Sequence, residues 1–340
     1  EGPEYTSLSD MMASMCQKHA DSPAFENMGK TLTYGEIDAQ SKDFAAYLQV
    51  EGGLQKGDRI AIQMPNLLQY PIVLFAALRA GLIVVNTNPL YMPREMEHQY
   101  KDAEVKAVII VANFASNLEK VLKTTEVSHI IVTELGDSIG GFKGWFINKA
   151  VKHLKKMVPD YSIPKAVTFK TAMKRGAELT FKPPAITVDD TAFLQYTGGT
   201  TGVSKGAMLS HSNILAHTRQ IRMWFTPLLH AGQRDIMITA IPMYHIFALT
   251  VNCIFMWNIG AENVLITNPR DMKGFVKTLK KTRFTLMTGV NTLFNGLLAQ
   301  PEFKQVDFNQ LKGTIGGGMA VQDFVAKKWQ EVTGTPLVEG

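Results

Sequence analysis

Arg59-Ile-Ala-Ile-Gln-Met64 is a short apolar run that follows a Gly-Asp turn. Three more runs of this kind follow it, Leu82-Ile-Val-Val85, Ala107-Val-Ile-Ile-Val111 and His129-Ile-Ile-Val132. The intervening segments have helical apolar spacing, over residues 70–80, 93–102 and 117–124. Strands rich in Val and Ile that alternate with helices are typical of a parallel sheet covered on both faces. The sequence therefore predicts an α/β fold.

The second half of the chain repeats this alternation. Strands are expected over residues 235–239, 263–266, 284–287 and 311–315. Helices are expected near residues 248–257, 272–281 and 292–299. We therefore expect two α/β subdomains, about 1–185 and 186–340, each with its own mainly parallel sheet covered by helices. Near the amino terminus, residues 23–29 and 31–34 indicate two strands around a turn, before a helix over residues 35–48.

Composition narrows the class of protein. Apolar residues make up 46% and charged residues 19% of the 340 residues, which is an ordinary globular balance. No run of about 18 uncharged apolar residues predicts a membrane-spanning helix, and the first five residues lack the pattern of a signal peptide. The two cysteines, Cys16 and Cys253, exclude a disulfide framework and a cysteine zinc site. We expect a cytoplasmic protein with buried, reduced thiols.

The net charge of +5 is concentrated in one segment. Between Gly141 and Lys182 the chain has ten Lys or Arg residues and only two acids. Because the rest of the chain is slightly acidic, no nucleic-acid partner is expected.

Within that segment, Phe142 to Met157 has the pattern of a basic amphipathic helix. Its apolar stripe consists of Phe142, Phe146, Ala150, Leu154 and Met157. The lysines that lie off the stripe are Lys149, Lys152, Lys155 and Lys156. This pattern suits peripheral contact with an anionic membrane surface. The alternative is a helix whose apolar stripe packs on its own domain and whose lysines face solvent.

The main functional signal is the loop Gln195-Tyr-Thr-Gly-Gly-Thr-Thr-Gly-Val-Ser-Lys-Gly-Ala207. Glycines allow backbone N–H groups to approach a phosphate, and hydroxyls and Lys205 add hydrogen bonds and charge. The loop lacks the Gly-Lys-Ser/Thr order of a Walker A motif and the spacing of a dinucleotide fingerprint. Residues 192–196 and 207–210 read as strands, so the loop is expected to join a hairpin. From chemistry alone, phosphate binding and a simple flexible hairpin both stay open.

Tyr196 to Gly206 resembles the phosphate-loop signature of the AMP-forming adenylating superfamily. That superfamily contains acyl-CoA synthetases, firefly luciferase and peptide-synthetase adenylation domains. Pro242-Met-Tyr-His245 resembles its second core motif, and Gly316-Gly-Gly-Met319 resembles its adenine-side glycine turn. Asn88-Pro-Leu-Tyr91 and Thr288-Gly-Val-Asn-Thr-Leu-Phe294 are similar to bacterial long-chain fatty-acid–CoA ligases. The resemblance covers essentially all 340 residues.

The resemblance implies an activity and its partners. A long-chain fatty acid would be activated by ATP to an acyl-adenylate and then converted to acyl-CoA, with Mg²⁺ as cofactor, coenzyme A as co-substrate and release of AMP and pyrophosphate. It also implies a possible homodimer. The chain would be most of the N-terminal AMP-binding domain, without the small C-terminal catalytic domain, and would be inactive alone. The alternatives are a medium-chain or aryl acid adenylating enzyme and a non-catalytic nucleotide- or lipid-binding fragment.

The resemblance also implies the site residues. His245 and Lys205 would be catalytic, with His245 beside the acyl carboxylate, and Thr197 would contribute to the magnesium shell. The acyl tunnel would be bordered by Gly289, Val290, Asn291 and Thr292. The nucleotide would be bound by Tyr196, Thr197, Gly198, Gly199, Thr200, Thr201, Gly202, Val203, Ser204, Lys205, Gly206, Gly316, Gly317, Gly318 and Met319. The alternative for His245 is a histidine without a ligand.

Overall fold

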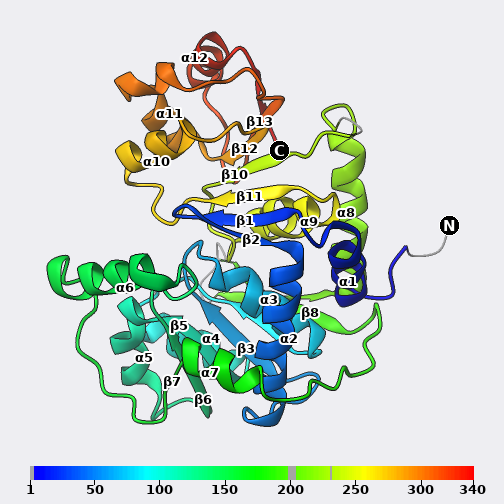
Figure 1. The fold of residues 1–340 in the computed structure, drawn as a ribbon, viewed down its shortest axis with the longest axis vertical. Coiled ribbons are helices and arrows are strands. Elements are labelled where there is room, and N and C mark those ends of the chain that lie inside the picture. Colours follow the sequence, from blue (N-terminus) through cyan, green and yellow to red (C-terminus); the bar gives the residue numbers. More distant parts are fainter. Residues whose placement is uncertain (1–3, 198–203, 230–231) are drawn as a thin grey trace. The chain divides into compact units, whose positions relative to one another are not determined.

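The computed structural model describes residues 4–197, 204–229 and 232–340 (Figure 1). They form two compact units. Unit 1 comprises Glu1–Ala20 and Tyr34–Ala216, and unit 2 comprises Asp21–Thr33 and His217–Gly340. This division differs from the expected boundary near residue 185, because two strands beyond that point complete the sheet of unit 1. A hairpin near the amino terminus likewise completes the sheet of unit 2.

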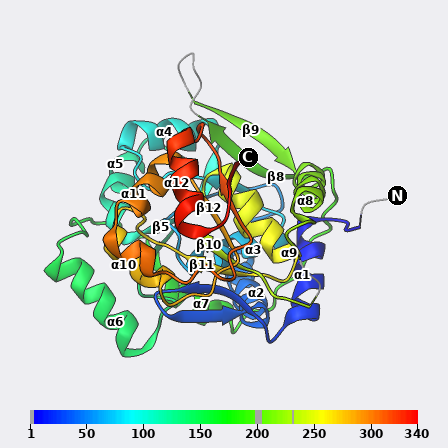
Figure 2. The same cartoon turned by 90° about the horizontal axis from the view of Figure 1, so that it is seen from above.

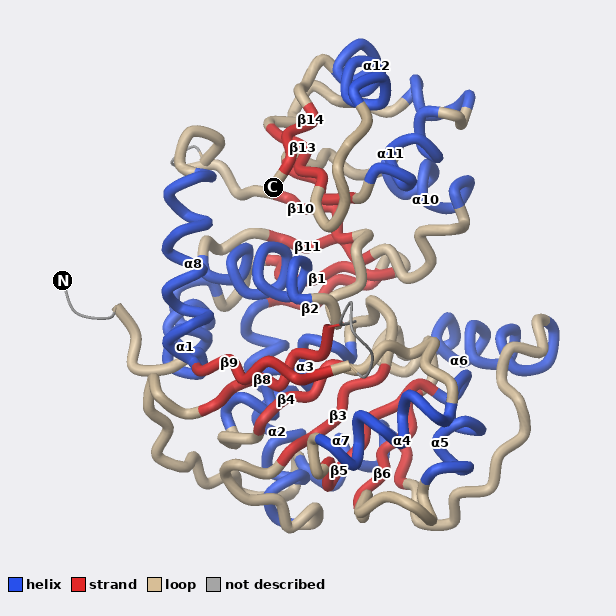
Figure 3. The backbone as a smooth tube through the Cα atoms, turned by 180° about the vertical axis from the view of Figure 1, so that it is seen from behind, coloured by secondary structure: helices blue, strands red, loops and turns tan. Residues whose placement is uncertain are grey.

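Unit 1 is built on a sheet of seven strands, of which only the last pair is antiparallel. Figure 3 shows the strands in red. Their order in the sheet is β7 (Val167–Thr168), β6 (His129–Thr133), β5 (Val105–Val111), β3 (Arg59–Gln63), β4 (Ile83–Asn86), β8 (Thr191–Thr197) and β9 (Lys205–Ser210). Ile60 and Ile62 of β3 point to opposite faces of the strand from Ala61, and all three are fully buried. The parallel sheet covered on both faces, predicted from the sequence, is confirmed.

Helices cover both faces of this sheet. One layer contains four helices, with α2 in contact with the other three: α1 (Leu8–His19), α2 (Tyr34–Val50), α3 (Gln69–Arg79) and α7 (Phe169–Gly176). The other face is covered by α4 (Pro93–Asp102) and α5 (Ala115–Val121), which pack against the strands through Met96, Tyr100 and Leu118. After β6, α6 (Gly141–Lys149) continues directly into a π-helix, η2 (Ala150–Leu154).

Unit 2 repeats the plan with a second seven-stranded sheet. Its order is β14 (Leu337–Glu339), β13 (Gly313–Gly316), β12 (Leu286–Gly289), β10 (Ile236–Thr239), β11 (Glu262–Leu265), β1 (Pro23–Asn27) and β2 (Lys30–Thr33). All neighbours are parallel except β1 and β2. The predicted hairpin near the amino terminus is present. Its first strand pairs with β11, with Phe25 opposite Asn263.

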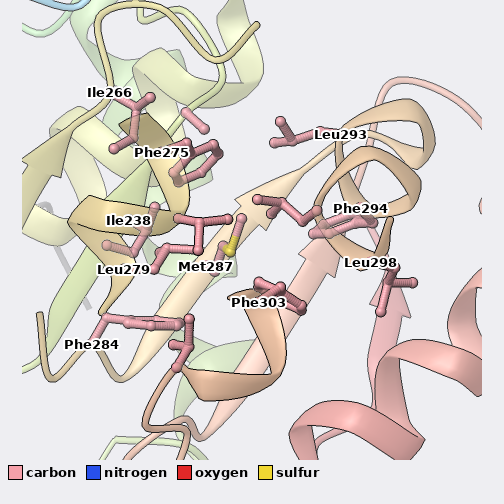
Figure 4. Close-up of a cluster of buried hydrophobic side chains, with 14 of the residues drawn as sticks. Ile238, Ile266, Phe275, Leu279, Phe284, Met287, Leu293, Phe294, Leu298 and Phe303 are labelled. Atoms are coloured by element: carbon pink, nitrogen blue, oxygen red, sulfur yellow. The ribbon is translucent and has the colours of Figure 1, made fainter. Parts of the chain in front are cut away.

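The core of unit 2 lies on both sides of this sheet. On one side, α10 (Met272–Leu279), α11 (Asn291–Leu298) and α12 (Asp323–Thr333) enclose Phe275, Phe294 and Trp329. Figure 4 shows Phe275 and Phe294 within this cluster. On the other side lie the end of α8 (His211–Phe225), the π-helix η3 (Ala248–Phe255) and α9 (Met256–Asn258). Figure 2 shows β10 and β12 between α10–α12 and α9.

Several local predictions differ from the structure in detail. The helix expected over residues 248–257 is π-helical over Ala248–Phe255. The strand expected over residues 284–287 begins two residues later, at Leu286. Cys16 and Cys253 are both buried and unpaired, and burial raises the pKa of Cys16 to about 12, so this thiol is unreactive. Within the described ranges, every helix is too short or too polar to cross a bilayer.

Candidate functional site

The predicted phosphate loop lies at the tip of the β8–β9 hairpin in unit 1. The two strands pair with Tyr196 opposite Gly206 and Thr197 opposite Lys205, so the expected hairpin is confirmed. Thr197 and Lys205 are exposed. The remaining loop residues lie outside the described residues: Gly198, Gly199, Thr200, Thr201, Gly202 and Val203.

The base of the loop is clamped across the hairpin. The Ser204 hydroxyl donates a hydrogen bond of 2.9 Å to the Thr197 carbonyl oxygen. Gly206 packs against the ring of Tyr196, and a Cβ atom added there would lie 2.8 Å from the ring. The two ends of the loop are therefore held together, and the Lys205 side chain is exposed with no ion pair among the residues that the structure describes.

Helix α4 holds this base from the side. The Nε2–H of His98 donates to the carbonyl oxygen of Ser204 at 2.9 Å, and the Tyr196 hydroxyl donates to the Asp102 carboxylate. Burial and the adjacent Asp102 carboxylate raise the pKa of Tyr196, so its hydroxyl stays protonated. His98 and Asp102 had no role in the sequence prediction. Their roles follow from the strand order, which only the structure shows. Because β4 lies beside β8, the helix after β4 lies next to the hairpin.

His245 lies in unit 2, between β10 and η3. It lies beyond the end of β10, which stops at Thr239. Its N–H donates to the Pro242 carbonyl at 3.0 Å, and its carbonyl accepts from Leu249 N at 2.9 Å, which begins the helix. The imidazole lies beside the Tyr244 ring, with 4.5 Å between centroids, and the residue is exposed. Partial burial lowers the pKa of His245, which favours a neutral imidazole at neutral pH.

The glycine turn follows β13 and depends on close backbone contacts. Gly317 N donates to the Gly289 carbonyl at 3.1 Å, and Gly340 N donates to the Gly316 carbonyl at 2.9 Å. A Cβ atom on Gly317 would lie 3.0 Å from the Phe247 ring. Gly318 has a φ of 76°, a left-handed conformation that glycine adopts without strain. Next to it, Met319 is exposed.

The predicted acyl segment lies beside this turn. Gly289 ends β12, Val290 precedes α11, and Thr292 lies in its first turn. The Asn291 side chain accepts a hydrogen bond of 3.0 Å from Gln322 N, which joins α11 to the start of α12. Unit 2 therefore brings the glycine turn and the acyl segment together at the carboxyl ends of neighbouring parallel strands, where α/β sheets bind ligands.

A buried polar network beneath this region was missed by the sequence prediction. Asn252 of the π-helix η3 donates to the hydroxyls of Thr239 at 3.0 Å and Thr288 at 2.8 Å. Thr239 in turn donates to Asn263 at 2.7 Å. The network ties η3 to β10, β11 and β12, and π-helices are frequent at functional sites. Asn252 inside an apolar stretch was a sequence signal for this network, because a buried side-chain amide needs hydrogen-bond partners.

A metal ion would find few protein ligands in either unit. Within the described parts of the chain, no three His, Cys, Asp or Glu residues are grouped to hold one. Thr197, the predicted magnesium ligand, offers a hydroxyl oxygen at an exposed position. That donor suits Mg²⁺, which takes oxygen ligands and retains several waters. Thr197 therefore suits a Mg²⁺ ion that is bound mainly by the phosphates of a nucleotide and by water.

Comparison with known proteins places these features in a family. Residues 12–340 match the family model described as AMP-binding enzyme. A long-chain-fatty-acid–CoA ligase of Salmonella typhimurium is 52% identical over 336 residues. That alignment covers 99% of this chain, but this chain spans only 60% of the relative.

Two solved structures show the same fold. The anthranilate CoA ligase AuaEII has a TM-score of 0.82 and 19% identity over 99% of this chain and 60% of its own. A long-chain-fatty-acid-CoA ligase (FadD1) from Archaeoglobus fulgidus has a TM-score of 0.80 and 22% identity over 100% of this chain and 65% of its own. Since the family match extends through both units and includes each predicted motif, this chain belongs to the AMP-binding enzyme family.

Proposed function

We propose that this protein acts as a long-chain fatty acid–CoA ligase of the AMP-forming type. The observation that carries the proposal is its similarity to ligases of that name over nearly the whole chain, which includes both the β8–β9 hairpin and the glycine turn. The proposal includes a small further domain with additional catalytic residues, in line with the greater length of those relatives.

The chemistry explains the residues at the hairpin. A fatty acid carboxylate oxygen attacks the α-phosphorus of ATP, the bond to the β-phosphate oxygen breaks, and pyrophosphate leaves. The thiol of coenzyme A then attacks the acyl carbon, and AMP leaves. Because two anions must meet, the first step needs positive charge and hydrogen-bond donors around the phosphates. Exposed Lys205 supplies the charge, and Ser204 holds the base of the loop around it.

The segments of unit 2 would bind the remaining parts of the substrates. The glycine turn allows a flat base to approach its backbone, because Gly316, Gly317 and Gly318 carry no side chain. We assign Gly289 to Thr292 to the border of the acyl site. His245 acts there as a neutral imidazole, because its pKa is lowered. The N–H of the neutral ring can donate a hydrogen bond to the carboxylate of the fatty acid.

Magnesium belongs to the proposal as a companion of the nucleotide. Thr197 would supply one oxygen ligand, and phosphate oxygens and water would supply the rest. When bound, the ion neutralises charge on the phosphates. Thr197 and Ser204 orient the loop independently of the ion, through the hydrogen bond between them.

The proposed setting is the cytoplasmic side of a membrane. Long-chain fatty acids partition into bilayers, so reversible contact of the enzyme with an anionic surface brings it to its substrate. A homodimer, also expected from the resemblance, stays a prediction.

Exchange of pyrophosphate into ATP that depends on added fatty acid tests the activation step, with the full-length protein as the enzyme. We expect exchange with long-chain fatty acids and its loss in Lys205→Met, but not in Lys327→Met, a matched change at an exposed lysine of α12. Acyl-CoA formation is then followed across acids of graded length. If acyl-CoA formation were fastest with medium-chain or aryl acids, those acids would be assigned as the substrate instead of long-chain fatty acids. Absence of exchange with every acid would leave only a binding protein.

A further inference from the structure

Residues 141–157 reverse the usual arrangement of a surface helix. Phe142, the most exposed of its large apolar side chains, keeps 78% of its surface accessible. Five large apolar side chains are at least half exposed: Phe142, Trp145, Phe146, Leu154 and Met157. Ile147, by contrast, is half-buried, and Val151 is buried. Such a gathering of exposed apolar groups is uncommon on a globular protein unless something binds there. Four members of the predicted stripe, Phe142, Phe146, Leu154 and Met157, therefore face away from their own domain. The predicted helix is shorter than expected, because it ends at Leu154 and Met157 lies beyond it.

The side of α6 that does face unit 1 is small and polar. Its buried residues in α6 are Gly144 and Asn148, and the buried side continues with Val151 in η2. A Cβ atom on Gly144 would lie 2.3 Å from the Gly136 carbonyl oxygen, so the helix backbone lies directly on that loop. Gly136 N donates to the Asn148 side chain at 2.7 Å, and Asn148 donates to Asp137 at 3.1 Å. These contacts fix the helix with its bulky side chains outward.

The outward aromatic side chains form a cluster. The ring centroids of Phe142 and Trp145 are 5.6 Å apart, and those of Phe142 and Phe146 are 6.5 Å apart. In Figures 1 and 3, α6 lies at the edge of unit 1, beyond α5. The cluster is thus an apolar contact surface on a fixed helix. Aromatic rings of this kind favour the boundary between lipid headgroups and acyl chains.

The charged side chains of residues 141–157 are all basic. Lys149, Lys152, Lys155 and Lys156 are exposed, and none lies within 4 Å of a carboxylate in the described parts of the chain. Residues 141–157 contain no acid at all. A second copy of this face would bring lysines against lysines, whereas an anionic bilayer offers both diffuse negative charge and apolar depth. Charge complementarity therefore selects a lipid surface.

We infer that the face formed by Phe142, Trp145, Phe146, Leu154, Met157 and the four lysines binds anionic bilayers reversibly. The aromatic cluster enters the headgroup boundary, and the lysines contact the headgroups. This inference gives a surface to the membrane contact in the proposed function, and it takes its purpose from that function. Its test does not use catalysis, so the two can fail separately.

Co-sedimentation with vesicles tests the inference directly. The protein is mixed with phosphatidylcholine vesicles with or without phosphatidylglycerol, at low and high salt. We expect binding only to the anionic vesicles and its loss at high salt. Tryptophan emission should shift to shorter wavelength on binding, and this shift should be absent in Trp145→Phe.

Two pairs of variants separate apolar from electrostatic contributions. Phe142→Ser/Phe146→Ser should weaken vesicle binding by about tenfold or more, whereas Met223→Ser/Trp224→Ser removes two other strongly exposed apolar side chains and should leave it unchanged. Lys152→Gln/Lys155→Gln/Lys156→Gln should weaken it on the order of tenfold to a hundredfold. Lys304→Gln/Lys327→Gln/Lys328→Gln has the same net charge and should have little effect. Circular dichroism verifies that each variant is folded.

Three outcomes would overturn the inference. They are absence of binding to anionic vesicles, equal binding to neutral ones, and equal losses in the matched variants. Conversion of a dimer to a monomer by Phe142→Ser/Phe146→Ser would assign the face to a second copy instead. Vesicle binding without pyrophosphate exchange would support the membrane-binding face and contradict the proposed ligase activity. Pyrophosphate exchange without vesicle binding would support the ligase activity and contradict the membrane-binding face.

Discussion

The two units present their candidate residues at similar places in similar sheets but hold them by different means. In unit 1, the hairpin residues Thr197 and Lys205 are exposed, and side chains from α4 hold the base of the loop. In unit 2, Gly289 and Gly317 contact each other through the backbone, with aromatic rings packed against both. We therefore expect that changes at the candidate residues of unit 1 leave stability unaltered, whereas changes at the candidate residues of unit 2 alter it.

The largest effect is expected from Lys205→Met in unit 1. Loss of its charge should lower the rate of adenylation by roughly 100- to 1000-fold, the usual cost of removing one group that stabilises developing charge. The free energy of unfolding should change by less than about 0.5 kcal/mol, because the side chain is exposed. Exchange kinetics and urea denaturation measure the two quantities. A large loss of stability would contradict this expectation for unit 1.

Acid should destabilise unit 1 through a buried histidine, His211, which follows the end of β9. His211 is 1% exposed, and its Nδ1 accepts a hydrogen bond from Leu8 N at 3.1 Å. Burial lowers its pKa to about 4, an effect that outweighs the attraction of the Asp190 carboxylate. The unfolded chain binds the proton more tightly than the folded chain, so stability is full above the unfolded pKa and falls as the pH drops toward 4. The loss should reach about 3 kcal/mol.

Denaturation curves between pH 7 and pH 4 measure this slope. His211→Asn keeps a hydrogen-bond acceptor for Leu8 N and cannot be protonated in this range, so it should flatten the curve. Carboxylates also titrate here, and only the difference between wild type and variant isolates the histidine. Parallel slopes in the two proteins would show that His211 is not the acid-sensitive group.

In unit 2, Gly289→Ala should reduce both stability and activity. The added Cβ would lie 2.5 Å from the ring of Phe294, which is fully buried and packs against Trp329 with 4.9 Å between centroids. Overpacking of this kind costs about 2 kcal/mol. Thermal unfolding with exchange assays would record both losses.

Gly296→Ala is the matched control for that change. Gly296 lies in α11, and its added Cβ would meet only the flexible end of Met272, at 2.7 Å. Alanine favours helices by about 1 kcal/mol over glycine, so this variant should be as stable as the wild type or more so. Equal destabilisation by both substitutions would mean that the close approach at Gly289 has no special role.

The smallest effect is expected from His98→Ala in unit 1. It removes the hydrogen bond to the Ser204 carbonyl, worth about 1 kcal/mol, so KM for ATP should rise by about fivefold. KM for the fatty acid should not change. His98→Gln, which retains a side-chain donor, should restore most of the ATP affinity. If His98→Ala altered only the fatty acid KM, the contact would have no part in holding the loop.

Local patterns in the sequence predicted much of this architecture. Apolar runs located the strands around Ile60 and Ile109, and the Gly/Thr-rich loop predicted a hairpin before any pairing was known. His245 and the glycine turn were assigned by resemblance, and both follow strands that the apolar runs predicted. What the patterns could not supply was the order of strands within each sheet.

That order determines the residues that sequence analysis missed. His98 reaches the hairpin only because β4 lies beside β8, and Asn252 finds its partners only because β10, β11 and β12 are neighbours. The apolar stripe on 142–157 was identified correctly, but its direction depends on Gly144 and Asn148, whose contacts are with a loop. Pairings between distant segments set these features, and a local pattern contains no record of them.

The sheet of unit 2 combines strands from distant parts of the sequence, and this affects folding during translation. The hairpin of β1 and β2 leaves the ribosome early, yet β1 pairs with β11, more than two hundred residues further along the chain. At roughly 5–20 residues per second, this strand waits on the order of 10 to 50 s for its partner. During translation it is an unpaired apolar edge, exposed to chaperones and to other nascent chains.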